Sequence, residues 1–287
     1  MDQHWRVAFE ARLVALRPAL HRYAARMVGS ALDGEDVVQE AIARAVAALD
    51  RAPPDANADG WLFRIAHNAA MDFLRARERG RSRVIEEDDL ISRADEAASR
   101  VATRAALSLF MRLPPSQRGA VILKDVLGYS NEESAGILGT TLAATKAALH
   151  RGRSRLRILA DAPTTAPRLD PADLDRLRVY VDRFNARDFD AIRTMIADDV
   201  QFDLVARMRG DRSTFETYFS RYDAMREWHL TVGSIDGRLA AIVTNPADPG
   251  RPTHVIVIDW AGEKISRLRD FYHARYVLDE AAITMSA

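Results

Sequence analysis

The chain has 287 residues, of which 48% are hydrophobic and 29% are charged, and this length favours about two domains, although three small ones would also fit. No run of residues approaches the roughly 18 apolar residues that a membrane span requires, and the N-terminus lacks the apolar stretch of a signal peptide. We therefore expect a cytoplasmic protein without membrane contact. The absence of cysteine excludes disulfides and thiolate chemistry and removes most zinc-finger designs.

The net charge is zero, but the two parts of the chain differ in sign. Residues 1–160 carry 24 Lys and Arg against 20 Asp and Glu, a balance of +4, whereas residues 161–287 carry 17 against 21, a balance of −4. Basic residues are clustered at 75–83, and no acidic residue occurs from 134 to 160. Clustered positive charge is typical of nucleic-acid binders, although Arg-rich helix faces exposed to solvent are also common.

Two helical modules are expected in the first 160 residues. Apolar residues recur there at spacings of three and four, as in amphipathic helices. Gly and Pro clusters interrupt this pattern, and an acidic stretch lacks bulky aromatic side chains. We predict a first module over 1–84, a linker over 85–105, a second module over 106–160 and a proline-containing linker over 161–171.

The second module has the local signals of a helix-turn-helix over 116–157. Its first helix follows two prolines and ends at Gly128. Ser130 and Glu133 have the spacing of a capping box, which predicts a short second helix. Gly139 supplies a tight turn, and either Thr140 or Thr141 can cap the third helix.

The third helix is predicted to have two distinct faces. Its leucines recur every seven residues and predict a buried stripe, which comprises Leu142, Leu149 and Leu156. Its basic residues step by four, three and four and share another face, which comprises Lys146, His150, Arg153 and Arg157. This arrangement is typical of a helix that reads the DNA major groove, but a plain helical hairpin with a solvated basic side has the same pattern.

Residues 172–287 change in character and predict an α+β domain. Two helices, at about 172–187 and 188–197, precede several segments that are rich in β-branched residues and alternate between apolar and polar side chains. We therefore expect a multidomain protein, with two all-α modules followed by an α+β cone domain that has a curved antiparallel sheet.

Three blocks of the sequence together resemble the extracytoplasmic-function (ECF) sigma factors of bacterial RNA polymerase: DGEDVVQEAIARA at 33–45, GWLFRIAHNAAMDFLRAR at 60–77 and the helix-turn-helix at 113–157. The resemblance implies a specificity subunit that directs RNA polymerase to promoters. Its implied partners are promoter DNA and the β′ clamp and β flap of the core polymerase, with no catalytic residues, cofactor or metal. Asp36, Gln39 and Glu40 correspond to the segment that docks on the clamp.

The resemblance also implies DNA contacts. The residues that correspond to the segment that melts the minus-ten element are Trp61, Arg64 and Asn68, with Arg75 and Arg77 on phosphates. Trp61 and its neighbour Phe63 can equally be core residues. The residues that correspond to the reader of the minus-thirty-five element are Thr141, Thr145, Lys146, His150, Arg151 and Arg153. The chain has Ala147 and Ala148 where the family usually has a Ser-Arg pair, so the promoter sequence is left open.

The segment 179–204 resembles the opening of the SnoaL-like, ketosteroid-isomerase-like cone fold. Tyr180 falls on the oxyanion-tyrosine position of that family, but Leu204 falls on the position of the base and Val255 near the second donor. Asp203 is one residue away and should point to the opposite face of its strand. Our pocket candidates are Tyr180, Asp203, His229 and Asp259, while His254, Asp270 and His273 are further polar residues that could supply an Asp–His pair.

The sequence is consistent with three functions. In the first, the chain is a sigma factor whose C-terminal domain regulates it through intramolecular contacts, polymerase contacts or a small apolar ligand in the C-terminal pocket. Alternatively, a DNA-binding module is fused to a catalytically active isomerase or hydrolase domain. The third hypothesis is a two-module transcription regulator that works without polymerase.

Overall fold

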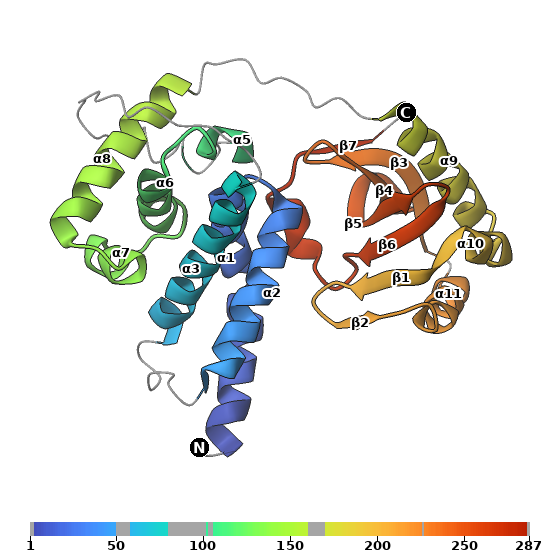
Figure 1. Ribbon diagram of the computed structural model, residues 1–287, viewed down its shortest axis with the longest axis horizontal. Coiled ribbons are helices and arrows are strands. Elements are labelled where there is room, and N and C mark those ends of the chain that lie inside the picture. The colour runs from blue at the N-terminus through green and yellow to red at the C-terminus, as the bar shows by residue number, and fades with distance from the viewer. Residues whose placement is uncertain are drawn as a thin grey trace. The chain divides into compact units, whose positions relative to one another are not determined.

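A computed structural model describes residues 3–49, 58–79, 102, 106–159, 170–225 and 227–285, with side chains from Val7 onward. The chain divides into two compact units, residues 1–164 and 165–287, and each unit is described by itself (Figure 1). The predicted linkers at 85–105 and 161–171 fall almost entirely outside the described residues. The linker boundaries therefore stay predictions.

Long helices form the first part of the helical unit, residues 1–164 (Figure 1). Ser30 caps the second of these helices, and its hydroxyl accepts the backbone N–H of Asp33 at 3.2 Å. Gly34 lets the first two helices approach closely, because a Cβ there would lie 2.6 Å from the Cα of Ala25. The helices are α1 (Gln3–Val28), α2 (Ala31–Ala47) and α3 (Ala58–Arg79).

The helix-turn-helix follows, and its turns form as the sequence predicts. Ser130 and Glu133 make both hydrogen bonds of the capping box, and Gly139 has a left-handed φ of 65°. Thr141, rather than Thr140, caps the last helix by accepting the N–H of Ala144 at 3.1 Å. The elements are α5 (Leu107–Phe110), α6 (Pro115–Val121), the π-helical turn η3 (Ile122–Val126), α7 (Asn131–Leu138) and α8 (Leu142–Leu159).

One hydrophobic core joins the two helical modules. Phe63 on α3 is buried and packs edge-on against Tyr129, which precedes α7, with ring centroids 5.2 Å apart. Arg118 on α6 is 3% exposed, and its guanidinium donates to the carbonyl of Met27 on α1 and, at 2.8 Å, to the carbonyl of Leu113. The modules therefore share buried apolar and polar contacts.

The C-terminal domain, residues 165–287, is built around a seven-stranded sheet among its described residues, in the order β2-β1-β6-β5-β4-β3-β7. The prediction of an antiparallel sheet is wrong in one respect, because β1 pairs parallel with β6 and the sheet is mixed. Parallel neighbours need a long connection, which β2, a helix and a β3–β5 meander supply here. The strands are β1 (Ile196–Leu204), β2 (Met208–Gly210), β3 (His229–Ile235), β4 (Arg238–Asn245), β5 (Asp248–Ala261), β6 (Lys264–Asp270) and β7 (Ile283–Met285).

Helices and aromatic side chains fill the concave side of this sheet. Phe184 lies at the centre, with its ring centroid 5.0 Å from that of Tyr222 and 5.1 Å from that of Trp228. Such edge-to-face pairs add to the free energy of apolar burial. The helices are α9 (Pro171–Asn185), α10 (Phe189–Met195) and α11 (Thr214–Ala224), and their placement against the sheet is visible in Figure 1.

The end of the domain is a turn followed by a short edge strand. Strand β6 ends at Asp270, whose Oδ1 accepts the N–H of Tyr272 at 2.8 Å and thereby turns the chain. A 3₁₀ turn, η4 (Arg275–Asp279), follows, and β7 then adds to the edge of the sheet beside β3. The side chain of Asp270 is fixed at the end of its strand by this turn.

Candidate functional site

The predicted polymerase-docking residues lie on a part of α2 that the core does not cover. Asp36 and Gln39 are half-buried and Glu40 is exposed, while the opposite side of the helix is buried. Glu40 pairs with Arg44 at 2.8 Å, and Arg44 also pairs with Asp72 of α3 at 2.7 Å. The hydrogen bond from Arg44 lowers the pKa of Asp72, so this carboxylate stays ionised beside Arg44 at neutral pH.

The predicted minus-ten residues divide into exposed and structural groups. Arg64 and Asn68 are exposed on α3, and Trp61 is half-buried with its ring centroid 6.1 Å from that of Phe9. Arg75 is exposed and lies 3.5 Å from Asp72.

Arg77 makes a contact within the protein. It is half-buried, and its Nη1 donates to the carbonyl of Val28 at 3.1 Å. Arg77 therefore closes the C-terminal end of α1 in this conformation, and its contact with a phosphate stays a prediction. Its position within a run of basic residues gave no sign in the sequence that a distant carbonyl would accept its N–H.

The predicted minus-thirty-five residues also divide into two groups. Thr141 is exposed at the start of α8, Lys146 and Arg151 are exposed along it, and His150 is half-buried. Arg153 is held by Asp125 of η3 through two hydrogen bonds, one of which joins Nε to Oδ2 at 2.9 Å. This pair fixes α8 against η3.

The prediction that Thr145 contacts DNA is wrong for this conformation. Thr145 is 1% exposed, and its hydroxyl donates to the carbonyl of Thr141 at 3.0 Å. It belongs to the packed side of α8, one turn before Leu149. The seven-residue leucine pattern marked that side as buried but did not show how wide it is, because residues such as Thr145 and Ala148 also pack there.

A cavity of about 260 Å³ separates α3 from α8 in the helical unit. Its wall includes His67 and Met71 from α3 and Thr145 and Ala148 from α8. His67 Nδ1 lies 2.7 Å from the hydroxyl of Tyr23, and burial lowers the pKa of His67 to about 4. His67 is therefore neutral at pH 7 and accepts the hydrogen bond of Tyr23.

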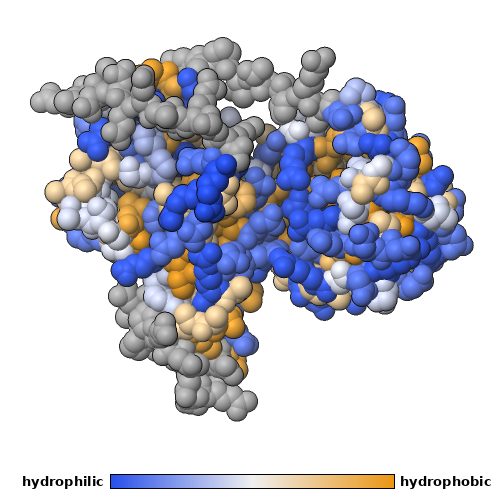
Figure 2. Space-filling model, viewed as in Figure 1, coloured by the Kyte–Doolittle hydropathy of each residue, from blue (hydrophilic) through white to orange (hydrophobic). Residues whose placement is uncertain are grey.

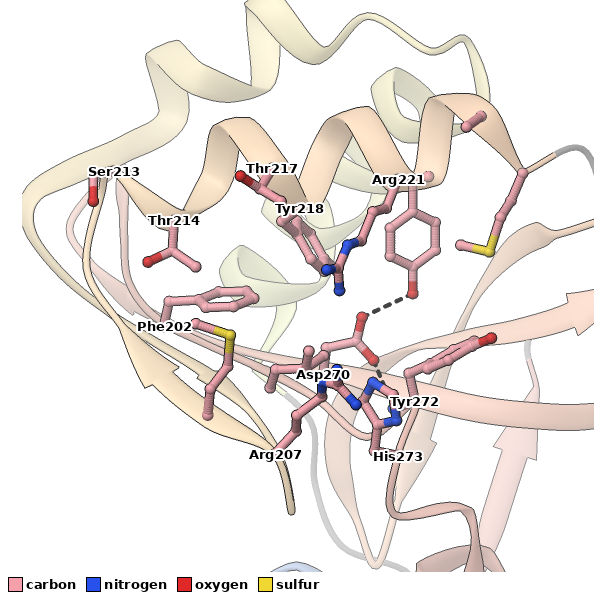
Figure 3. Close-up of a pocket in the computed structure, with 15 residues that line it drawn as sticks. Phe202, Arg207, Ser213, Thr214, Thr217, Tyr218, Arg221, Asp270, Tyr272 and His273 are labelled. Carbon is pink, nitrogen blue, oxygen red and sulfur yellow. Dashed lines mark hydrogen bonds between the residues drawn. The ribbon is translucent and has the colours of Figure 1, made fainter.

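The C-terminal domain contains a pocket of about 690 Å³ between α11 and the strands β1 and β6 (Figure 3). None of our four pocket candidates lines it. Tyr180 is fully buried in the core, and Asp203 faces away from the pocket, where Arg209 and Arg267 lie 3.9 Å from its carboxylate. His229 is exposed at the start of β3, and Asp259 lies 3.5 Å from Arg238. Leu204 does line the pocket, as the alternation of β1 predicted.

The acidic group of the pocket is Asp270, which the sequence offered among several residues but did not single out. In the sheet, Asp270 of β6 is the neighbour of Leu204 of β1, so a carboxylate stands one strand away from Leu204 in the pocket wall. The register of β1 against β6 brings these residues together across 66 positions of sequence. Local pattern carries no information about that register.

Asp270 belongs to a buried chain of hydrogen bonds. Tyr222 on α11 donates to Asp270 Oδ2 at 2.8 Å, and its oxygen lies 2.7 Å from His254 Nε2. The single proton of the tyrosine goes to the carboxylate, so His254 donates from Nε2. Burial lowers the pKa of His254, and burial and the charge of Asp270 raise the pKa of Tyr222. Tyr222 and His254 are therefore both neutral at pH 7.

The described residues contain no group of three or more His, Asp or Glu side chains that could hold a metal ion. Within the same part of the chain, no helix is both long and apolar enough to cross a membrane.

Comparisons with known proteins place both helical modules in one family. Residues 13–80 match the model of sigma-70 region 2, and residues 103–156 match the model of sigma-70 region 4. EcfG of Rhodopseudomonas palustris, an ECF RNA polymerase sigma factor, is 34% identical over 155 residues, which cover 51% of this chain and 82% of that protein. The fold and the two matched regions thus define a sigma-70-type transcription factor.

The similarity also extends beyond the helical unit. The ECF sigma factor SigG of Mycobacterium tuberculosis is 25% identical over 300 residues, which cover 92% of this chain and 80% of that protein. A solved structure of the M. tuberculosis ECF sigma factor SigJ aligns with 91% of this chain and 95% of its own, at 21% identity and a TM-score of 0.37. The chain belongs to the ECF RNA polymerase sigma factors. It is a non-enzymatic specificity subunit that directs RNA polymerase to promoter DNA for transcription initiation.

Proposed function

We propose that α2 docks this sigma factor on the β′ clamp of the core polymerase, in the cytoplasm, through Asp36, Gln39 and Glu40. The observation that supports this proposal is their placement on the uncovered side of α2, while the buried side holds the helix in the core. An exposed acidic face suits recognition of a basic partner surface.

Charge reversal tests this docking surface. Asp36→Arg combined with Glu40→Arg should weaken binding of core polymerase by about tenfold or more, which corresponds to roughly 1.4 kcal/mol. The matched control is Glu10→Arg, an exposed acid on α1. Unchanged polymerase affinity of the double variant would refute the docking assignment.

We propose that Trp61, Arg64, Asn68 and Arg75 contact the minus-ten element and that exposed residues of α8 contact the minus-thirty-five element.

The hydrophobic core that the two modules share limits how far apart their DNA contacts can lie. Two promoter elements about 25 base pairs apart are separated by roughly 85 Å along straight B-DNA. The two modules now pack within one hydrophobic core, so promoter binding requires the helix-turn-helix to leave α1 and α3.

Fluorescence transfer measures this opening directly. The chain has no cysteine, so Glu78→Cys on α3 and Glu132→Cys on α7 provide two exposed labelling positions. Transfer should be high in the free protein and fall strongly in the polymerase–promoter complex, because its efficiency falls steeply with distance. Equal transfer in the two states would contradict opening.

We propose further that the C-terminal domain regulates promoter engagement through contacts with the helical modules or polymerase, or through a ligand. The observation that supports regulation is a formed pocket, with a buried hydrogen-bond chain at its base, in a domain that lies outside the two matched sigma regions. Run-off transcription by the full chain should differ from that of a chain ending at Asp161. Equal transcription would remove this proposal.

A further inference from the structure

Two arginines at the pocket of the C-terminal domain have no partner of their own. Arg207 follows β1 and Arg221 lies on α11, and Figure 3 shows both side chains pointing into the pocket from opposite sides. Neither guanidinium makes a hydrogen bond or an ion pair with any residue that the structure describes. Other arginines of the domain, such as Arg193 and Arg212, are paired with carboxylates.

The acid closest in the pocket does not neutralise these arginines. Asp270 accepts hydrogen bonds from the hydroxyl of Tyr222 and the N–H of Tyr272, and it forms no ion pair with Arg207 or Arg221. His273, also at the pocket, has a lowered pKa because of burial and then the charge of Arg207, so it is neutral at pH 7. The lining of the pocket therefore carries two arginines against one aspartate, an excess of positive charge.

The remaining wall is apolar. Phe202 and Leu204 of β1, Met208 of β2 and Met225 after α11 contribute hydrophobic surface. A volume of about 690 Å³ is in the usual range for pockets that enclose small organic molecules. The structure thus combines a hydrophobic enclosure with two guanidinium groups that face each other across it and have no partner among the described residues.

We propose that this pocket binds an amphipathic organic anion, with its apolar body against β1, β2 and Met225 and its acidic head between Arg207 and Arg221. Guanidinium groups match carboxylates and phosphates through paired, charge-assisted hydrogen bonds. Positive charge at the mouth of an apolar cavity also raises the local concentration of anions. The inference specifies the ligand of the regulatory domain proposed above, and it rests on that proposal for its effect on transcription.

Calorimetry on the purified full chain, without polymerase, tests this inference. The probes are decanoate, decyl phosphate, decanol and decyltrimethylammonium. One or both anions should bind with one site per chain, decanol should bind at least about tenfold more weakly, and the cation should not bind. The two anions separate a carboxylate from a phosphate head.

Matched variants locate the site. Arg207→Met and Arg221→Met should each weaken anion binding by about tenfold and leave decanol binding unchanged, because methionine replaces the unbranched apolar stem of arginine and removes its charge. Arg251→Met, at an exposed arginine on β5, should have no effect. Met208→Ser should weaken the anions and decanol alike, since it removes apolar surface that both probes share.

Several results would overturn the inference. These are the absence of binding by both anions, equal binding of anion and alcohol, or anion binding that survives the Arg207→Met and Arg221→Met double variant. Loss of promoter DNA binding in these variants without loss of anion binding would assign the arginines to nucleic acid instead. Anion binding together with transcription that is unchanged in the chain ending at Asp161 would refute only the regulatory proposal.

Discussion

The two units of this protein use their arginines in opposite ways. In the helical unit, Arg118 is buried and gives its donors to backbone carbonyls of both modules, and Arg77 closes the end of α1. In the C-terminal domain, Arg207 and Arg221 face an open pocket without a protein partner. In the helical unit these guanidinium groups bind backbone carbonyls and help to hold the DNA-binding modules together, whereas the pocket leaves charge available to a molecule from outside.

Within the helical unit, the exposed hydrophobic residues and the polar contacts between the modules lie in different places. Exposed valines lie along α1 and at the end of α2, and Figure 2 shows hydrophobic surface beside the start of the chain. The valines are Val7, Val14 and Val46. The polar contacts that hold the unit closed lie elsewhere, between the modules.

The largest expected effect is the loss of Arg118. Arg118→Met leaves the carbonyls of Met27 and Leu113 without a donor in a buried site, so the free energy of unfolding of the helical unit should fall by about 3 kcal/mol. Urea unfolding followed by the helical circular dichroism signal measures this change. Arg221→Met is the matched control and should change stability by no more than about 0.5 kcal/mol. Similar losses for both variants would contradict the contrast between Arg118, which binds buried carbonyls, and Arg221, which has no partner among the described residues.

Protonation of each buried histidine in acid should destabilise the helical unit by an amount similar to the loss of Arg118. Burial lowers the pKa of His21 and of His67 from 6.5 to about 4, so the unfolded chain binds protons at a higher pH than the folded unit does. The contribution of each histidine to the free energy of unfolding is fully present above pH 6.5. It is lost as pH falls toward 4, by up to roughly 3 kcal/mol for each histidine. Urea midpoints between pH 7 and pH 4.5 measure the slope. In His67→Gln the change of the urea midpoint with pH should be about half as steep. An unchanged slope would show that His67 does not contribute to the loss of stability in acid.

The hydrogen-bond chain of the C-terminal domain gives a smaller effect. Tyr222→Phe removes the donor to Asp270 and should lower the stability of this domain by about 2 kcal/mol. Tyr272→Phe is the control, because the hydroxyl of Tyr272 makes no hydrogen bond to a described residue. Thermal unfolding of the two variants, monitored by near-ultraviolet circular dichroism, separates them. Equal midpoints would show that the buried carboxylate does not depend on Tyr222.

The smallest effects concern two glycines of the helix-turn-helix. A Cβ at Gly152 would lie 2.7 Å from Cγ2 of Val121 and 3.1 Å from the carbonyl oxygen of Gln117, so Gly152→Ala should destabilise the unit by about 1–2 kcal/mol. Gly136 lies in α7 with open space around it, so Gly136→Ala should stabilise the unit by about 0.5 kcal/mol or slightly more. Urea midpoints of both variants provide the measurement, and a stabilising Gly152→Ala would contradict the close packing of α6 on α8.

Local chemistry explains why the helix-turn-helix was predictable and the pocket was not. The capping box at Ser130, the left-handed Gly139 and the cap at Thr141 each depend on residues within four positions of one another. The orientation of Leu204 toward the pocket was also predictable from neighbouring residues, because side chains alternate along a strand. Local pattern gave no information where the position of a distant element was needed, as for the burial of Thr145 and the carbonyl partner of Arg77.

The sequence by itself determined the family, the caps and turns of the helices, and the face of β1 that lines the pocket, since these follow from contiguous motifs and from the periodicity of helices and strands. Tertiary structure alone decided that the two modules share one core around Arg118, that β1 runs parallel to β6, and that Asp270 rather than Asp203 faces the pocket. The physical reason is that register and packing depend on the summed contacts of residues far apart in the chain, which no local pattern encodes.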